Sequence, residues 1–245
     1  MHVKKIIIIA SCVLLLCVGI VGVVFFSQGK EETAQKGNVY QTSSYITEEM
    51  KAKVQKCDVN LCLSEEYTPE KLLKDADEIV IASVISIDSA TAREGLFGMT
   101  RGKIVINNSL KGNFKTGEIV EYAKNGGIFT MAEWEATQPE AANAKRAYLR
   151  QKEGLDLDLN NTYIEIGFDS DCEIEEGKTY LMYLKKYEES YEIIGLDIGL
   201  REVDMPKVDS VTPNSLDVEK LQVKNNKTGE FEPLDSYINT HIIAH

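Results

Sequence analysis

The chain has 245 residues but only three histidines and one tryptophan. The histidines are His2, His241 and His245, so no imidazole lies in the long middle part of the sequence. A serine or cysteine nucleophile usually needs a histidine base, and this scarcity disfavours both kinds of catalytic triad. The sequence also lacks a P-loop, a GxGxxG motif after a strand and an HExxH motif. These absences argue against the common nucleotide-binding sites, zinc proteases and triad hydrolases.

Candidate metal ligands are equally sparse. His241 and His245 are four residues apart and would share one face of a helix, but they end the chain, where fraying is normal. Asp156, Asp158 and Asn160 resemble the first half of a calcium loop whose later glycine and glutamate are missing. We therefore expect neither a metal nor a cofactor.

Basic residues are in short supply as well. Lysine and arginine number 27 against 39 acidic residues, which gives a net charge of -12. Such a surface repels phosphate backbones, so nucleic acid is not an expected partner.

Cysteine is scarce, and the five cysteines are Cys12, Cys17, Cys57, Cys62 and Cys172. The first two lie in an apolar N-terminal run, which leaves three for the rest of the chain. Three cysteines allow three single pairings. Closeness in sequence favours a Cys57–Cys62 disulfide, with Cys172 as the alternative partner, and three free thiols are the other possibility.

The strongest positive signal is that N-terminal run. Residues 6–26 carry no charge, and a helix of this length spans about 30 Å of hydrocarbon. The run is longer than a secretory signal, and Lys4 and Lys5 precede it, which places the tail 1–5 in the cytoplasm. The sequence predicts a single-pass signal anchor in the cell membrane with an extracytoplasmic C-terminal domain. Lipid attachment at Cys12 is the alternative anchor.

Two short helices are predicted after a polar segment. Residues 27–45 lack periodic apolar positions and indicate a flexible stalk. Thr47 is a suitable N-cap for a first helix. Thr68 and Pro69 suit the N-cap and first turn of a second helix.

From residue 78 onward the pattern changes to β-strand. Gly112 and Gly117 permit positive φ in a hairpin connection, where Lys111 and Lys115 are expected to be solvated. The strands and short flanking helices predict a mainly β fold, a small antiparallel OB-like barrel. The expected strands are 78–88, 101–110, 117–123, 162–169, 177–187 and a strand pair or bent strand within 191–204.

The barrel domain is assigned to residues 46–204, and residues 205–245 form a C-terminal extension that ends in a short helix. Within the domain, residues 130–161 are alanine-rich and charged, and they predict a helical insertion across one end of the sheet.

Three large side chains at the start of this insertion have two possible roles. They are Phe129, Met131 and Trp134. They could cover one end of the barrel, or they could form an exposed anchor for a partner.

Several pieces of the sequence occur in a recognisable order. Cys57 and Cys62 precede a short helix, and the pieces that follow occupy residues 76–84, 103–120, 125–127, 175–186 and 193–203. This order resembles bacterial relatives of the netrin-like domain, the OB-fold module also found in tissue inhibitors of metalloproteinases. The resemblance covers residues 57–203 and implies an OB fold in a surface protein of Gram-positive type. The zinc-chelating N-terminal cysteine of the animal inhibitors is not carried over, because Cys57 lies inside the chain.

Together these features predict a membrane-tethered binding module without catalytic activity, whose partner is a protein or another ligand of the cell envelope. A protease-inhibitor-like surface protein is one alternative. A carboxylate-dependent hydrolase is the other, with Asp169, Asp171 and Glu173 at alternate positions as candidate acids.

Overall fold

The computed structural model describes residues 38–59, 67–93, 98–168, 171–188 and 190–243, which belong to one compact unit. The tail 1–5 and the predicted membrane segment 6–26 lie outside these residues, as do Cys12 and the first part of the predicted stalk. No helix in the described part of the chain is both long enough and apolar enough to span a bilayer.

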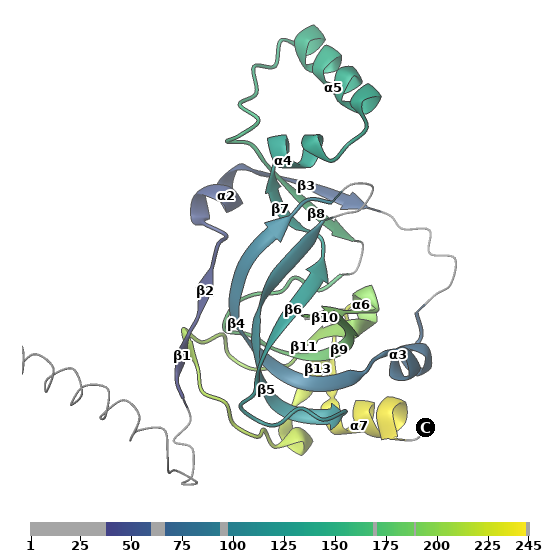
Figure 1. Cartoon of the computed structure of the whole chain (residues 1–245). Coiled ribbons are helices and arrows are strands. Elements are labelled where there is room, and N and C mark those ends of the chain that lie inside the picture. The colour runs from purple at the N-terminus through teal and green to yellow at the C-terminus, as the bar shows by residue number, and fades with distance from the viewer. Residues whose placement is uncertain (1–37, 60–66, 94–97, 169–170, 189, 244–245) are drawn as a thin grey trace, which may run out of the picture. The chain divides into compact units, whose positions relative to one another are not determined.

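The fold is mainly β and is built around a seven-stranded sheet (Figure 1). Its strand order is β11-β9-β10-β6-β5-β4-β2, and β9 also pairs with β4. The pairings therefore run from β4 through β5, β6, β10 and β9 back to β4. These strands are β2 (Ser43–Ser44), β4 (Glu78–Thr91), β5 (Met99–Lys111), β6 (Ile119–Asn125), β9 (Thr179–Tyr187), β10 (Ser190–Ile193) and β11 (Leu200–Glu202).

The strands expected from residue 78 onward are present, with boundaries that move by a few residues. The expectation of a wholly antiparallel sheet is wrong at two places, because β10 is parallel to β6 and β2 is parallel to β4. The segment predicted as a strand pair within 191–204 is interrupted by a short helix, α6 (Leu196–Gly199). Gly195 precedes this helix with a φ of 89°, which is a conformation that interrupts a strand.

Both faces of β4 and β9 are buried. Val80, Ala82 and Val84 pack with Tyr180 and other β9 residues in one core cluster. The alternate residues Ile79 and Ile81 pack in a second cluster on the opposite face of the strand. Successive side chains of a strand point to opposite faces, which explains why this sequence is a near-continuous apolar run.

The C-terminal segment covers that second face. It contains β12 (Ser210–Val211), η1 (Val218–Lys220), β13 (Gln222–Lys224), β14 (Phe231–Pro233), α7 (Leu234–Ile238) and the π-helix η2 (Asn239–Ile243). The predicted terminal helix is confirmed, and its residues Tyr237, Ile238 and Ile242 are buried. Because Val223 and Leu234 share a core cluster with Ile79 and Ile81, this segment is part of the core rather than an appendage.

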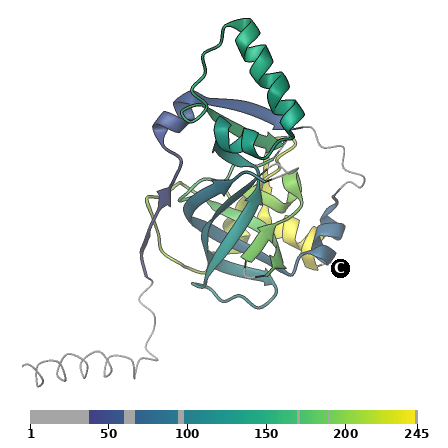
Figure 2. The ribbon, with the colours of Figure 1, turned by 45° about the horizontal axis from the view of Figure 1, so that its top comes forward.

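A second, three-stranded sheet has the order β3-β8-β7. Its strands are β3 (Val54–Val59), β8 (Tyr163–Phe168) and β7 (Gly127–Thr130). The predicted helical insertion 130–161 is confirmed as α4 (Met131–Ala136) and α5 (Glu140–Glu153), which lie between β7 and β8 in sequence. Figure 2 shows α4 against this small sheet, and Figure 1 shows α5 farther out at the same end of the unit.

The predicted stalk 27–45 is wrong in its last part. β1 (Tyr40–Gln41) pairs with β12, and β2 pairs with β4. Tyr40 packs against the buried cluster of Ile85, Val105 and Val211. This contact holds the polar segment against the domain.

The two predicted helix starts are confirmed. Helix α2 (Glu48–Lys53) is capped by the Thr47 side chain, which accepts a hydrogen bond from the Met50 amide. Helix α3 (Pro69–Asp75) is capped by Thr68, which accepts from the Lys71 amide, with Pro69 at its first position. These contacts satisfy amides that have no partner inside the helix.

The hairpin between β5 and β6 has a role beyond reversing the chain. Lys111 Nζ donates to the carbonyl oxygens of Leu73 and Ala76 at 2.7 and 2.5 Å, so it closes the C-terminal end of α3 and is not solvated as expected. Gly112 has a φ of 100°, and a Cβ there would lie 1.8 Å from a carboxylate oxygen of Glu78. Lys115 is exposed, as predicted.

Candidate functional site

A cavity of about 430 Å³ lies where the seven-stranded sheet meets the small sheet. We call it the main cavity. It takes residues from α2, from β3 to β8, and from the segment after β8. Its lining residues are Ile46, Lys51, Val54, Lys56, Ile87, Thr100, Lys124, Gly126, Gly127, Ile128, Glu165, Ile166, Gly167, Phe168, Asp171, Cys172, Glu173 and Ile174.

Two consecutive glycines bring the backbone of β6 and β7 close to the cavity wall. Gly126 has a φ of 89°, and a Cβ there would lie 2.5 Å from the Ile166 carbonyl oxygen. Gly127 has a φ of 141°, and its Cβ would lie 2.4 Å from Thr100 Oγ1. Thr100 in turn donates to the Gly126 carbonyl. The Asn-Gly-Gly sequence thus allows a tight crossing from one sheet to the other.

The lysines at the rim of the main cavity are each paired with carboxylates. Lys51 Nζ lies 2.9 Å from Glu48, and Lys56 Nζ lies 3.0 Å from Glu173 and 3.5 Å from Glu165. Hydrogen bonds to these partners raise the pKa of both lysines. Both lysine side chains are more than half exposed, so solvent screens these pairs.

A third pair lies deeper. Lys124 Nζ donates to Asp171, and their side chains are 13% and 8% exposed. Removal of one partner of an ion pair this far from water leaves an uncompensated buried charge. The pair joins the end of β6 to the segment that follows β8.

Cys172 places a thiol on the wall next to this pair. Burial raises its pKa to about 11. The thiol is therefore protonated at neutral pH, and a protonated thiol is neither a good nucleophile nor a metal ligand.

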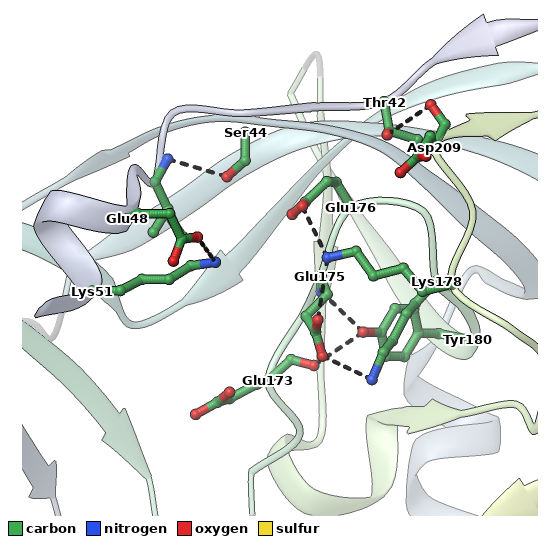
Figure 3. Close-up of polar contacts among 12 residues, drawn as sticks. Thr42, Ser44, Glu48, Lys51, Glu173, Glu175, Glu176, Lys178, Tyr180 and Asp209 are labelled. Carbon is green, nitrogen blue, oxygen red and sulfur yellow. Dashed lines mark hydrogen bonds and ion pairs between the residues drawn. The ribbon is translucent and has the colours of Figure 1, made fainter.

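Polar contacts hold the segment that carries Asp171, Cys172 and Glu173 in place (Figure 3). The Tyr180 hydroxyl donates to the Glu173 carbonyl at 3.1 Å and accepts from the Glu175 amide at 2.9 Å. Figure 3 also shows ion pairs around Glu175 and Glu176. They join Lys178 to Glu175 at 2.7 Å and Lys207 to Glu176 at 2.9 Å. These contacts fix this wall of the cavity.

The Glu175 pairs give a testable dependence on pH. Burial favours the neutral acid, but hydrogen bonds from Lys178 and Lys207 outweigh it and lower the pKa of Glu175 below 4.5. A lowered pKa in the folded state means that Glu175 contributes stability fully above pH 4.5 and loses it as pH falls through the folded pKa. We expect Glu175→Gln to flatten the acid side of the stability profile. Urea unfolding between about pH 3 and pH 7 measures this, with exposed Glu230→Gln as the control.

The residues predicted as a partner anchor have other roles in the structure. Phe129 is only 2% exposed and packs with Ile164 and Ile166, while Met131 and Trp134 pack partly buried against them. Phe129 is therefore buried and is not an exposed anchor, whereas Met131 and Trp134 are only partly buried, and a partner contact through them stays a prediction. Ala90 and Ala92 pack against the same cluster.

The predicted disulfide is not formed. Cys57 and Cys172 are both free thiols, which excludes the Cys57–Cys62 bridge as well as the alternative pairing with Cys172. Cys62 itself lies outside the described residues.

The candidate metal ligands do not converge. Within the described residues, no three histidine, cysteine, aspartate or glutamate side chains gather closely enough to hold a metal ion. Asp158 accepts hydrogen bonds from the Asn160 amide and the Asn161 side chain, which close a local turn. His245 and Asp169 lie outside the described residues.

Two of the acids proposed for a hydrolase form ion pairs. Asp171 pairs with Lys124, and Glu173 pairs with Lys56, which also contacts Glu165. Each of these carboxylates is therefore held by a lysine.

Sequence reasoning missed the main cavity itself. Its charged pairs join residues far apart in the chain, so no local spacing indicates them. The Asn-Gly-Gly sequence at 125–127 was the one local signal that the backbone passes close to another element here. A comparison of the chain with protein-family models and with curated proteins finds no match in either.

Proposed function

We propose that the chain is a membrane-tethered, extracytoplasmic binding module that holds its ligand in the main cavity and catalyses no reaction. In this proposal residues 6–26 are the anchor. The ring of pairings from β4 through β5, β6, β10 and β9 is the OB-like barrel that the resemblance to netrin-like domains implies.

The observation that carries this proposal is the state of the reactive groups around the main cavity. The lysines and acids face one another in pairs, and the Cys172 thiol is held protonated. No histidine occurs among the described lining residues. A side chain that acts as a general base or a nucleophile must be free of such pairing. The lining therefore supports binding rather than turnover.

The lining also indicates the character of the ligand. Lys51, Lys56 and Lys124 are balanced by Glu165, Asp171 and Glu173, and the remaining wall is largely isoleucine, valine and phenylalanine. A group that enters this cavity is expected to be amphipathic and to carry little net charge. It is part of a protein or of another envelope molecule.

The test uses the full chain, purified in a mild detergent, as bait for an extract of the native cell envelope. Ile174→Trp fills the main cavity, and Val208→Trp places the same side chain at a position that is 41% exposed and outside it. We expect one ligand to be retained by the wild type and by Val208→Trp but lost by Ile174→Trp. Equal retention by all three proteins would place binding elsewhere, and turnover of a retained molecule would contradict a non-catalytic role.

A further inference from the structure

A second, smaller cavity lies beside α7, far in sequence from most of the main cavity's lining. It measures about 210 Å³ and takes residues from β11, α6, α7, η2 and the turn between β13 and β14. We call it the C-terminal pocket. Its lining residues are Pro69, Ile198, Arg201, Asn225, Asn226, Lys227, Glu232, Tyr237 and His241.

The C-terminal pocket holds basic side chains in an acidic protein. Arg201 and Lys227 are among its described lining residues, together with the carboxylate of Glu232. The chain as a whole carries a net charge of -12. General attraction of anions to the surface is therefore absent, and any anion that binds here must do so through local contacts.

Arg201 is the fixed element of this pocket. It is 4% exposed, and its guanidinium carbon lies 4.3 Å from the centroid of the Tyr237 ring. Nε donates to the Lys224 carbonyl at 2.8 Å, and Nη2 donates to Glu232 at 2.6 Å. Nη1 has no acceptor in the described part of the chain. A buried guanidinium with an unused donor is suited to a planar or tetrahedral oxyanion.

His241 supplies the second unused group. Its ring lies 4.7 Å from the Tyr237 ring between centroids, tilted by 47°. Its Nδ1 atom is buried and has no hydrogen-bond partner among the described residues. Burial of a polar atom without a hydrogen-bond partner costs free energy. A bound group that accepts a hydrogen bond from Nδ1 would remove that cost.

Asn225 adds an amide donor on the turn. Its side-chain oxygen accepts from the Lys227 and Thr228 amides, which directs the oxygen into the turn. Its Nδ2 group has no acceptor within the described residues. Three kinds of N–H donor thus surround one small pocket.

We propose that the C-terminal pocket binds a small oxyanion, a phosphate or carboxylate group, through Arg201 Nη1, His241 Nδ1 and Asn225 Nδ2. This site is separate from the main cavity and does not depend on the function proposed for that cavity. A volume of about 210 Å³ accommodates one such group.

The test is a titration of the full chain, labelled with ¹⁵N-histidine, with inorganic phosphate and separately with acetate. Sodium chloride at matched ionic strength controls for screening. We expect the His241 ring signals, identified by their loss in His241→Phe, to shift and saturate with at least one of the two anions but not with chloride. The anion that saturates distinguishes phosphate from carboxylate chemistry.

Variants then locate the site by anion-dependent thermal stabilisation. His241→Phe retains a ring against Tyr237 but removes the Nδ1 donor, and we expect about tenfold weaker binding. Lys220→Gln also changes one basic residue, at a position 81% exposed and outside the pocket, and should bind as the wild type does. The proposal is overturned if neither anion acts beyond chloride, or if His241→Phe binds as tightly as the wild type.

Discussion

Replacing Lys124 by methionine is expected to lower the free energy of unfolding by about 3–5 kcal/mol. The change leaves the Asp171 carboxylate, whose side chain is 8% exposed, without its counter-charge. The larger part of the effect comes from that uncompensated charge and the smaller part from the lost contact. Urea denaturation of the full chain at neutral pH, followed by circular dichroism, gives the value.

A double variant separates these two parts. Lys124→Met combined with Asp171→Leu removes both charges, and we expect it to regain most of the lost stability, because an apolar pair of similar volume replaces the ion pair. The matched control is Lys220→Met, in a pair with Asp217 whose side chains are 81% and 53% exposed. That control should unfold as the wild type does. Equal stability of Lys124→Met and the wild type would mean that water reaches the Lys124–Asp171 pair.

Replacing Phe129 by alanine is expected to cost about 3–5 kcal/mol of stability. The Phe129 ring packs with Ile164 and Ile166 and closes over Gly98, where a Cβ would lie 2.2 Å from the ring. Truncation therefore opens a void between the small sheet and the start of β5. The same urea experiment measures the loss.

Tyr148→Ala is the control for this prediction, because it removes an aromatic ring that is 62% exposed on α5. We expect a change of no more than about 0.5 kcal/mol. If Phe129→Ala instead unfolded like the wild type and lost an envelope partner, the interpretation of Phe129 as an exposed anchor would be correct after all.

The sequence predicted those parts of the fold that depend on neighbours along the chain. Residues 78–88 form a near-continuous apolar run rich in valine and isoleucine, and this run is enough to place β4. The pair Thr68–Pro69 likewise places the start of α3, because an N-cap acts on amides two or three residues away.

The parts that sequence reasoning missed depend on distant partners. Strand β3 follows directly on α2, and its register is set by β8, with Val54 opposite Tyr163. Lys111 closes α3 through the carbonyls of Leu73 and Ala76, which precede it by 38 and 35 residues. The main cavity follows the same rule, since its Lys56–Glu173 and Lys124–Asp171 pairs are formed only when the two sheets meet.

The two shortest strands at the start of the described chain have a mechanical consequence. Tension applied near residue 38 enters the domain first through β1 and β2, which have two residues each. Few hydrogen bonds hold them, among them Thr42 to Asp209 at 3.0 Å and Tyr45 to Ile87 at 2.9 Å. Under load these strands would detach one after the other. Each step would lengthen the chain that precedes residue 46, while β4, β5 and β9 keep their pairing. The described domain therefore has a compliant end at β1 and β2, which yields before the pairing of β4, β5 and β9 is broken.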